Sequence, residues 1–151
     1  MDSPDIKLKP LKGYNAFAKF FKAGAKVYSK NAASVICFRG QCKDLNIKKI
    51  EPLFDSDVIF YGVTVSRKRA KKAVVRNRIK RLLRESLRQS IENYIDDAGN
   101  PQIKIIIITW TGETPQHPML IRLDDVKPAV EEILKKADKL YNEKFKGLQH
   151  N

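Results

Sequence analysis

The chain has 151 residues and a net charge of +13, from 30 Lys and Arg against 17 Asp and Glu. Its 42% of hydrophobic residues suffice for one packed core, which argues against a disordered protein and against several domains. No apolar run approaches the roughly 20 residues of a membrane helix, and no secretory signal is visible, so we expect a cytoplasmic protein that does not enter a membrane.

The chain divides into a short basic arm, one domain and a short tail. Residues 1–12 combine lysines with Pro4 and Pro10, which indicates a flexible arm. A single folded domain is expected over 13–146, because no internal repeat or low-complexity tract interrupts it. Residues 147–151 should form a flexible tail.

Aromatic residues mark the first expected element. Phe17, Phe20 and Phe21 recur at helical spacing within 15–22, and Gly24 is a suitable terminator, so this segment predicts a helix. Phe17 and Phe21 lie four residues apart and therefore share one helical face. On residue type alone such a pair belongs to a core, because Phe is a preferred interior residue.

Two strands are expected next, at 34–38 and 58–66, since both segments are rich in residues that favour strands. The residues between them, 39–57, should form a long connection or an irregular hairpin. Cys37 and Cys42 are the only cysteines. In a cytoplasmic setting we expect both to be reduced thiols without a bound metal.

The second half of the chain predicts two long helices separated by a strand. Apolar residues recur at helical spacing over 73–94, and a turn at 96–101 should end this helix. The short, β-branched run at 103–110 predicts a buried strand. After a loop at 111–124, residues 126–145 should form the last helix. The element order indicates an α+β sandwich with helices on a small sheet.

Most of the positive charge is concentrated in residues 66–88. This segment has 11 basic residues and one acidic residue, a net +10, whereas 1–65 carries +5 and 89–151 carries −2. Such a concentration opposes folding unless a polyanion offsets it, and the commonest polyanion is nucleic acid. The alternatives are a solvated helix face, which ordinarily alternates acids and bases, and a membrane-binding helix, whose apolar face the core needs here.

One face of the helix expected at 73–94 suits phosphate groups. The polar residues that project opposite its apolar stripe are Asn77, Arg81, Arg84 and Arg88. A guanidinium group donates two hydrogen bonds to one phosphate. Unpaired amides of the first helical turn add a further attraction for anions. The sequence therefore predicts a nucleic-acid-binding helix.

The same segment resembles the bacterial ribonuclease P protein family. The run Ala-Val-Val-Arg-Asn-Arg-Ile-Lys-Arg-Leu-Leu-Arg-Glu at 73–85 is similar to the family's signature. It follows a strand that ends Gly-Val-Thr-Val-Ser at 62–66 and the pair Arg67-Lys68. The resemblance covers about residues 8–140, and the segment 67–72 departs from it by lacking a glycine that is common there.

The resemblance implies a fold of helix, three strands, helix, strand and helix, like domain 2 of ribosomal protein S5, with a left-handed β–α–β crossover. It further implies a subunit of an endoribonuclease, which binds a catalytic RNA and the 5′ leader of precursor tRNA. The RNA would carry the chemistry and hold most of the Mg²⁺. We therefore expect no catalytic residue and no metal site in the protein, no activity of the protein alone, and no obligate protein partner.

Residue chemistry and the resemblance together predict two sets of RNA contacts. The residues expected to bind the RNA subunit are Arg67, Lys68, Lys71, Lys72, Arg76, Asn77, Arg78, Lys80, Arg81, Arg84 and Arg88. The residues expected to bind the leader are Phe17, Phe21, Lys22 and Ser66. Phe17 and Phe21 match two aromatics of the family's first helix, which favours base stacking for at least one of them, Phe17 first.

Two other functions remain open on the sequence. A ribosomal or other structural RNA-binding protein shares basic helices and small sheets, and activity of a reconstituted complex on precursor tRNA separates it. A DNA-binding regulator would insert the basic helix into a major groove. No heptad zipper follows the basic region, and competition with double-stranded DNA tests this alternative.

Overall fold

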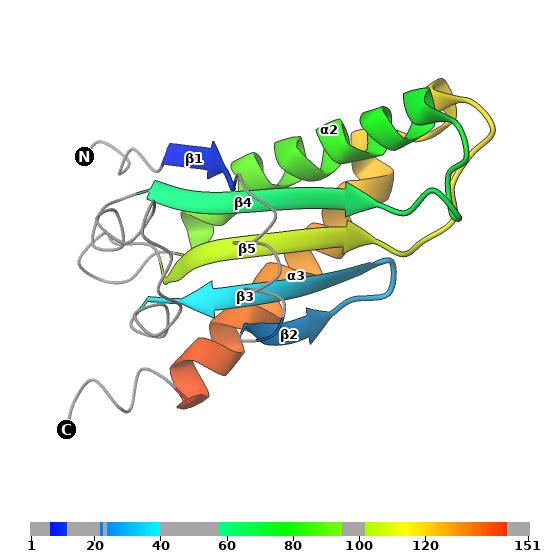
Figure 1. The fold of residues 1–151 in the computed structure, drawn as a ribbon. Helices are drawn as coiled ribbons and strands as arrows, with labels where there is room; N and C mark the ends of the chain where they lie inside the picture. Colours follow the sequence, from blue (N-terminus) through cyan, green and yellow to red (C-terminus); the bar gives the residue numbers. More distant parts are fainter. Residues whose placement is uncertain (1–6, 12–21, 23, 40–57, 95–101, 145–151) are drawn as a thin grey trace.

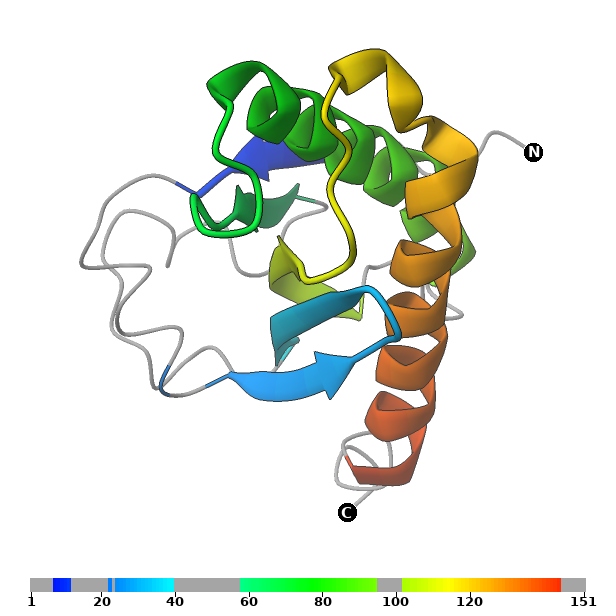
Figure 2. The same ribbon diagram turned by 90° about the vertical axis from the view of Figure 1, so that its right-hand side faces the viewer.

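The structure is a computed structural model that describes residues 7–11, 22, 24–39, 58–94 and 102–144. These residues form a two-layer α+β sandwich, in which two long helices cover one face of a five-stranded sheet (Figure 1, Figure 2). The strands are β1 (Lys7–Pro10), β2 (Ala25–Tyr28), β3 (Ala32–Phe38), β4 (Val58–Val65) and β5 (Ile103–Trp110). The helices are α2 (Ala73–Ser90) and α3 (Leu123–Lys144), with 3-10 helices η3 (Ile91–Asn93) and η4 (Pro118–Leu120). The expected fold class is confirmed.

The sheet mixes parallel and antiparallel pairs in the order β1-β4-β5-β3-β2. β4 pairs in parallel with β1 and with β5, whereas β3 pairs antiparallel with β5 and with β2. β5 is the central strand, and residues 105–108 are fully buried. This position explains why its sequence is a continuous run of isoleucines and does not alternate with polar residues.

The connection from β4 through α2 to β5 has an uncommon handedness. In Figure 1 the two strands run in the same direction side by side, and α2 lies behind the sheet. When the strands are turned to point upward in that view, β5 lies to the right of β4, which defines a left-handed crossover. The expected left-handed crossover is confirmed. The short connection between Val65 and Ala73 places the first turn of α2 near the carboxyl ends of β4 and β5.

The core lies between the sheet and the two helices. Its fully buried members include Ile59, Ile106 and Ile108 from the sheet, Ile79, Leu83 and Leu87 from α2, and Val130, Ile133 and Leu134 from α3. Truncating one such side chain to Ala costs about 2–5 kcal/mol of unfolding free energy. The buried stripe of α2 therefore fixes the direction of the helix's opposite, basic face.

Two strands lie where none was expected. β1 falls within the segment expected to be a flexible arm, and its Lys7 is in register with Val58 of β4, so that prediction is wrong for residues 7–10. Pro10 is tolerated because β1 is an edge strand, where a missing N–H costs no ladder bond. β2 was missed because its four residues are too few to show a period-2 pattern.

The other elements match their expected positions with small shifts. β3 begins two residues before the expected strand, and α3 begins three residues before the expected helix. α2 ends at Ser90 and continues as η3, so the expected single helix over 73–94 is divided. Of the helix expected at 15–22, only Lys22 is described, and it is helical. The segment 40–57 and the tail at 147–151 lie outside the described residues.

The thiol prediction is wrong for Cys37. This residue lies in β3, is 1% exposed and is disulfide-bonded. Cys42, the other cysteine of the chain, lies outside the described residues. The expectation of a reduced thiol rested on the redox state of an assumed compartment, which the spacing of two cysteines does not reveal.

Candidate nucleic-acid interface

A short loop carries the basic segment from the end of β4 to α2. The amides of Arg69 and Ala70 donate to the carbonyl oxygen of Ser66 at 3.2 and 3.1 Å, which closes a turn. Ala70 is 4% exposed and anchors the loop to the core. The loop's cations, all exposed, are Arg67, Lys68, Arg69, Lys71 and Lys72. The turn therefore presents five positive charges to solvent within six residues.

The exposed face of α2 continues this surface along the helix. Its buried residues include Ile79, Leu83 and Leu87, and the polar residues on the opposite face, all exposed, are Asn77, Arg81, Arg84 and Arg88. The predicted separation of an apolar and a basic face is confirmed. Lys80, at the border between the two faces, is half-buried. Arg81 and Arg84 have no ion-pair partner among the described residues.

Arg76 and Arg78 bind backbone carbonyl groups. The Nη1 atom of Arg76 donates to the carbonyl oxygens of Ala70 at 2.8 Å and Lys71 at 2.9 Å. The Nε atom of Arg78 donates to the carbonyl oxygen of Ile121 at 3.3 Å. Both side chains are half-buried. They therefore hold the loop and the segment before α3 against α2, a role that the sequence did not reveal because backbone acceptors leave no sequence signal.

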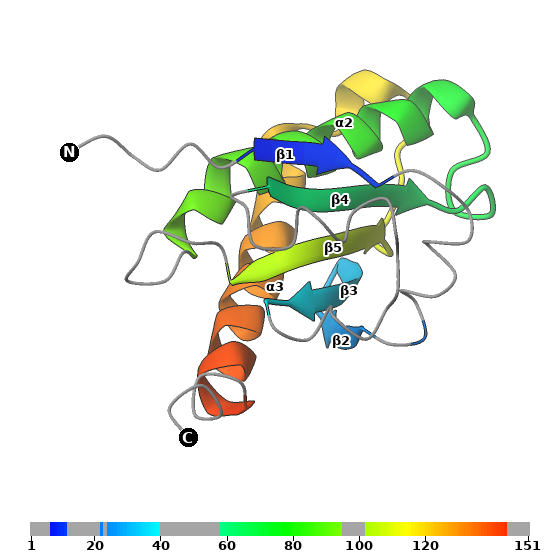
Figure 3. The same ribbon diagram turned by 60° about the vertical axis from the view of Figure 1, so that its left-hand side comes forward.

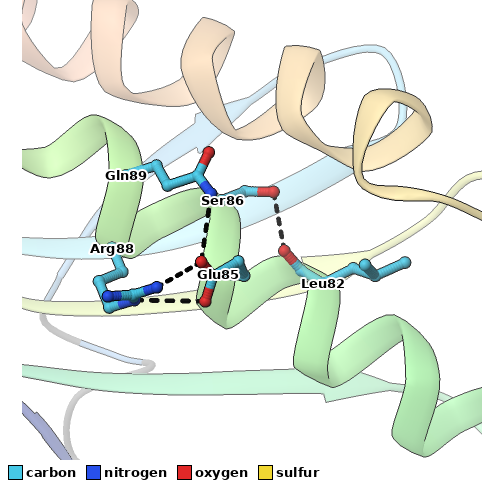
Figure 4. A network of polar contacts seen from close by, with 5 residues as sticks. All are labelled: Leu82, Glu85, Ser86, Arg88 and Gln89. Carbon is cyan, nitrogen blue, oxygen red and sulfur yellow. Dashed lines mark hydrogen bonds and ion pairs between the residues drawn. The ribbon is translucent and has the colours of Figure 1, made fainter.

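Glu85 neutralises one end of the basic face (Figure 4). Its carboxylate accepts hydrogen bonds from both Nε and Nη2 of Arg88 and from Nε2 of Gln89. The hydrogen bond from Arg88 is the main cause that lowers the pKa of Glu85 below its usual value, followed by that from Gln89. Of the cations predicted to bind RNA, Arg88 alone is ion-paired among the described residues.

A hollow of about 320 Å³ lies between the basic loop and the segment that follows β5. Its lining includes Lys68, Lys71 and Lys72 on one side and Thr114 and Gln116 on the other. Thr114 Oγ1 donates to the carbonyl oxygen of Arg69, and Lys72 Nζ donates to that of Gln116 at 3.2 Å. The first turn of α2 opens here without an acidic residue and without a capping side chain. Its amides and the lysines together favour anions.

The residues predicted to bind the leader are only partly described. Ser66 and Lys22 are exposed. Phe17 and Phe21 lie outside the described residues, so the choice between core and stacking positions stays a prediction for both. Ser66 lies where β4 runs into the basic loop, beside Arg67, so one leader position adjoins the surface predicted for the RNA subunit.

Other classes of site find little support in the described part of the chain. No three side chains of His, Cys, Asp or Glu are grouped there in a way that would hold a metal ion. His117 is exposed in the segment after β5. Within the same residues, no helix is long and apolar enough to cross a bilayer.

Comparison with known protein families shows the family of this chain. A family model described as Ribonuclease P matches residues 7–138, which include the whole basic loop and α2. The chain belongs to the ribonuclease P family. A comparison with curated protein sequences gave no match.

Solved structures of ribonuclease P proteins share the fold of this family member. The ribonuclease P protein of Staphylococcus aureus, in a structure at 2.0 Å, is 25% identical, with 85% of this chain and 94% of that chain covered and a TM-score of 0.55. The ribonuclease P protein of Thermotoga maritima is 20% identical, with 85% and 96% covered and a TM-score of 0.56. The arrangement of the sheet and the two helices is therefore that of ribonuclease P proteins.

Proposed function

We propose that the chain is the protein subunit of ribonuclease P, which binds a catalytic RNA and helps it remove the 5′ leader from precursor tRNA. The observation that carries this proposal is the uncompensated basic surface, with five exposed loop cations followed by Asn77, Arg81 and Arg84 on α2. Guanidinium and ammonium groups bind phosphates by charge-assisted hydrogen bonds. Membership of the ribonuclease P family supports a ribonuclease P RNA as the partner of this surface.

The two predicted RNA partners would occupy adjoining parts of the protein. The RNA subunit would contact the basic loop and α2, where the buried stripe of the helix holds the arginines in place. The leader would pass Ser66 and Lys22, with Phe17 or Phe21 stacking on its bases. Mg²⁺ would be held mainly by the RNA, since this ion keeps several waters and prefers phosphate oxygens. A cytoplasmic location is part of the proposal.

The protein's own contribution would be binding and positioning. Contacts made only with the leader distinguish precursor from mature tRNA, because the mature product lacks that single strand. Contacts with the RNA subunit place the leader-binding surface beside the scissile bond. Neither contribution requires a general acid or base from the protein.

Reconstitution with a ribonuclease P RNA tests the proposal. At the same Mg²⁺ and salt concentrations, protein and RNA together should cleave precursor tRNA at its 5′ end faster than the RNA alone. Rigorously RNA-free protein should not cleave. A structural RNA-binding protein, the runner-up, would bind RNA without changing cleavage. That result, or robust cleavage by the protein alone, would overturn the proposal.

A further inference from the structure

Tyr28 is an exposed aromatic residue at the edge of the sheet farthest from α2. It is the last residue of β2, and its side chain is 58% exposed, although aromatic side chains usually bury most of their surface. Figure 3 shows the face of the sheet away from α2 and α3, with β2 and β1 at opposite edges. No function described above uses this residue.

The backbone around Tyr28 is held firmly in place. Lys136 Nζ on α3 donates to the carbonyl oxygen of Tyr28 at 2.8 Å. The turn that follows is tied to α3 by the amide of Lys30, which donates to Glu132 Oε2 at 3.4 Å. The amides of Thr111 and Gly112 donate to the carbonyl oxygen of Asn31 in the same turn. The phenol ring is therefore presented from a fixed backbone, which lowers the entropy lost when a ligand binds.

The strand register connects Tyr28 with the predicted leader path. Tyr28 pairs with Ala33, Ala33 with Thr109, and Thr109 with Thr64. Directly paired residues point to the same face of a sheet, and Val27 and Ser34, the next pair, point toward the helices, where Val27 joins the core. The four residues therefore form a row across the face opposite the helices.

The residues of this row keep part of their surface exposed. Thr64, Thr109 and Ala33 are half-buried, and the two threonine hydroxyls are 2.7 Å apart. Four strands at about 4.8 Å spacing span roughly 14 Å. Four-stranded sheets of comparable width bind two or three stacked bases. The row begins two residues before Ser66 and ends at Tyr28.

Positive charge accompanies the aromatic ring. Lys26 and Lys30 flank Tyr28 in sequence and are exposed, and neither ammonium group has an ion-pair partner among the described residues. An aromatic ring beside unpaired lysines fits single-stranded nucleic acid, whose bases stack while its phosphates pair with cations.

We propose that Tyr28 is a base-stacking residue for single-stranded RNA, placed where a leader that follows the row from Ser66 leaves the sheet. This inference rests on the proposed function, because it takes the leader as the occupant. Lys26 and Lys30 bind the phosphates on either side of the stacked base. The site adds affinity only for leaders long enough to cross all four strands.

A second copy of the chain fits this edge less well. Addition of a strand to β2 would need its outward backbone groups, yet the carbonyl oxygen of Tyr28 already accepts from Lys136. The exposed lysines of β2 and its turn would also repel their own copies. Dimerisation that Tyr28→Ala abolishes in analytical ultracentrifugation would overturn the inference.

The test measures binding of the reconstituted holoenzyme to three RNAs, which are mature tRNA and precursors with a short or a long leader. Tyr28→Ala should weaken binding of the long-leader precursor by about 5- to 150-fold, the range for loss of one base stack, and leave the other two unchanged. Tyr28→Phe keeps the ring and should bind like wild type. Met119→Ala, which truncates a side chain that is 74% exposed in η4, is the matched control and should have no effect.

The outcomes separate this inference from the proposed function. Equal binding of the long leader by wild type and Tyr28→Ala, or equal losses for all three RNAs, would overturn the stacking role of Tyr28. If wild-type protein leaves the RNA subunit's preference for precursor over mature tRNA unchanged, the proposed function itself fails. Thermal unfolding of each variant serves as the folding check, and an unchanged melting temperature is expected because the ring is exposed.

Discussion

α2 and α3 pack side by side on the same face of the sheet but differ in how their exposed charges are balanced. α3 carries six acidic and five basic residues, and its exposed side includes the ion pairs Lys127–Glu131 and Lys136–Glu132. α2 carries six basic residues and one acidic residue, Glu85, which pairs with Arg88. Both helices have a continuous buried stripe, so their packing requirements are alike.

This difference in charge balance shows which residues of each helix the fold requires. Packing on the sheet requires the apolar stripe and leaves the outer face free to vary. α3 has the mixed charges of a solvated helix. α2 has like charges at helical neighbour spacing, which destabilise a helix in isolation. The fold does not require the positive charges on the outer face of α2, and these charges oppose helix formation. A polyanionic partner explains why they are present.

The largest expected effect comes from shifting the charge balance of α2 toward that of α3. Arg84→Glu places an acid beside Arg81 and Arg88, so the helix should be no less stable. Loss of one charge-assisted contact should nevertheless weaken binding of the ribonuclease P RNA by about 10- to 100-fold. Filter binding and thermal unfolding measure the two effects.

Lys135→Glu on the exposed face of α3 is the matched control for Arg84→Glu, because it makes the same change in net charge. It should leave RNA binding nearly unchanged. Equal losses from the two variants would mean that net charge, and not the face of α2, determines affinity.

A smaller effect should separate the structural arginines of α2 from the RNA-binding ones. Arg76→Ala removes the two hydrogen bonds to the carbonyl oxygens of Ala70 and Lys71 and leaves the loop before α2 less restrained. We expect the unfolding free energy to fall by about 1–2 kcal/mol in urea titrations. Arg81→Ala, on the exposed face, should change it by less than about 0.5 kcal/mol. A reversed order would place Arg76 among the purely RNA-binding residues.

The smallest effect concerns Glu85. The pKa of Glu85 is lowered in the folded protein, mainly by the hydrogen bond from Arg88. Its ionised form therefore stabilises the fold at pH values above the ordinary pKa, and this contribution is lost as the pH falls through the lowered pKa. Glu85→Gln should therefore slightly flatten the acid limb of a plot of stability against pH. It should also release Arg88 and strengthen RNA binding at neutral pH. Glu132→Gln on α3, whose carboxyl pKa is likewise lowered, should flatten the acid limb without affecting binding of the ribonuclease P RNA, because Glu132 lies outside the α2 face.

Elements with strong hydrophobic patterns were predicted well from the sequence. The isoleucine run gave β5 its observed limits, and the apolar spacing of α2 correctly placed Arg81, Arg84 and Arg88 on the exposed face. β1 and β2 escaped prediction because each has only four residues, too few to show a period-2 pattern, and β1 in addition pairs with a strand distant in sequence. The left-handed crossover came from family resemblance, since residue patterns do not specify handedness and most crossovers are right-handed.

Charged residues were harder to assign than apolar ones. Arg76, Arg78 and Arg84 look alike in the sequence, yet two of them bind backbone carbonyl groups and one is unpaired among the described residues. Their roles depend on which carbonyl oxygens the loop at 70–71 and the segment before α3 bring within reach. Tyr28 was overlooked for a related reason, because its exposure follows from the edge position of β2.

The salt dependence of RNA binding tests the central claim most directly. The dissociation constant for the ribonuclease P RNA should be measured over a range of KCl concentrations for wild type, Arg81→Ala, Arg84→Ala and Lys135→Ala. If the exposed face of α2 binds phosphates, each arginine variant should lower the magnitude of the log–log slope by about 0.7–0.9, and Lys135→Ala should keep the wild-type slope. A common slope for all four proteins would show that α2 carries an ordinary solvated surface.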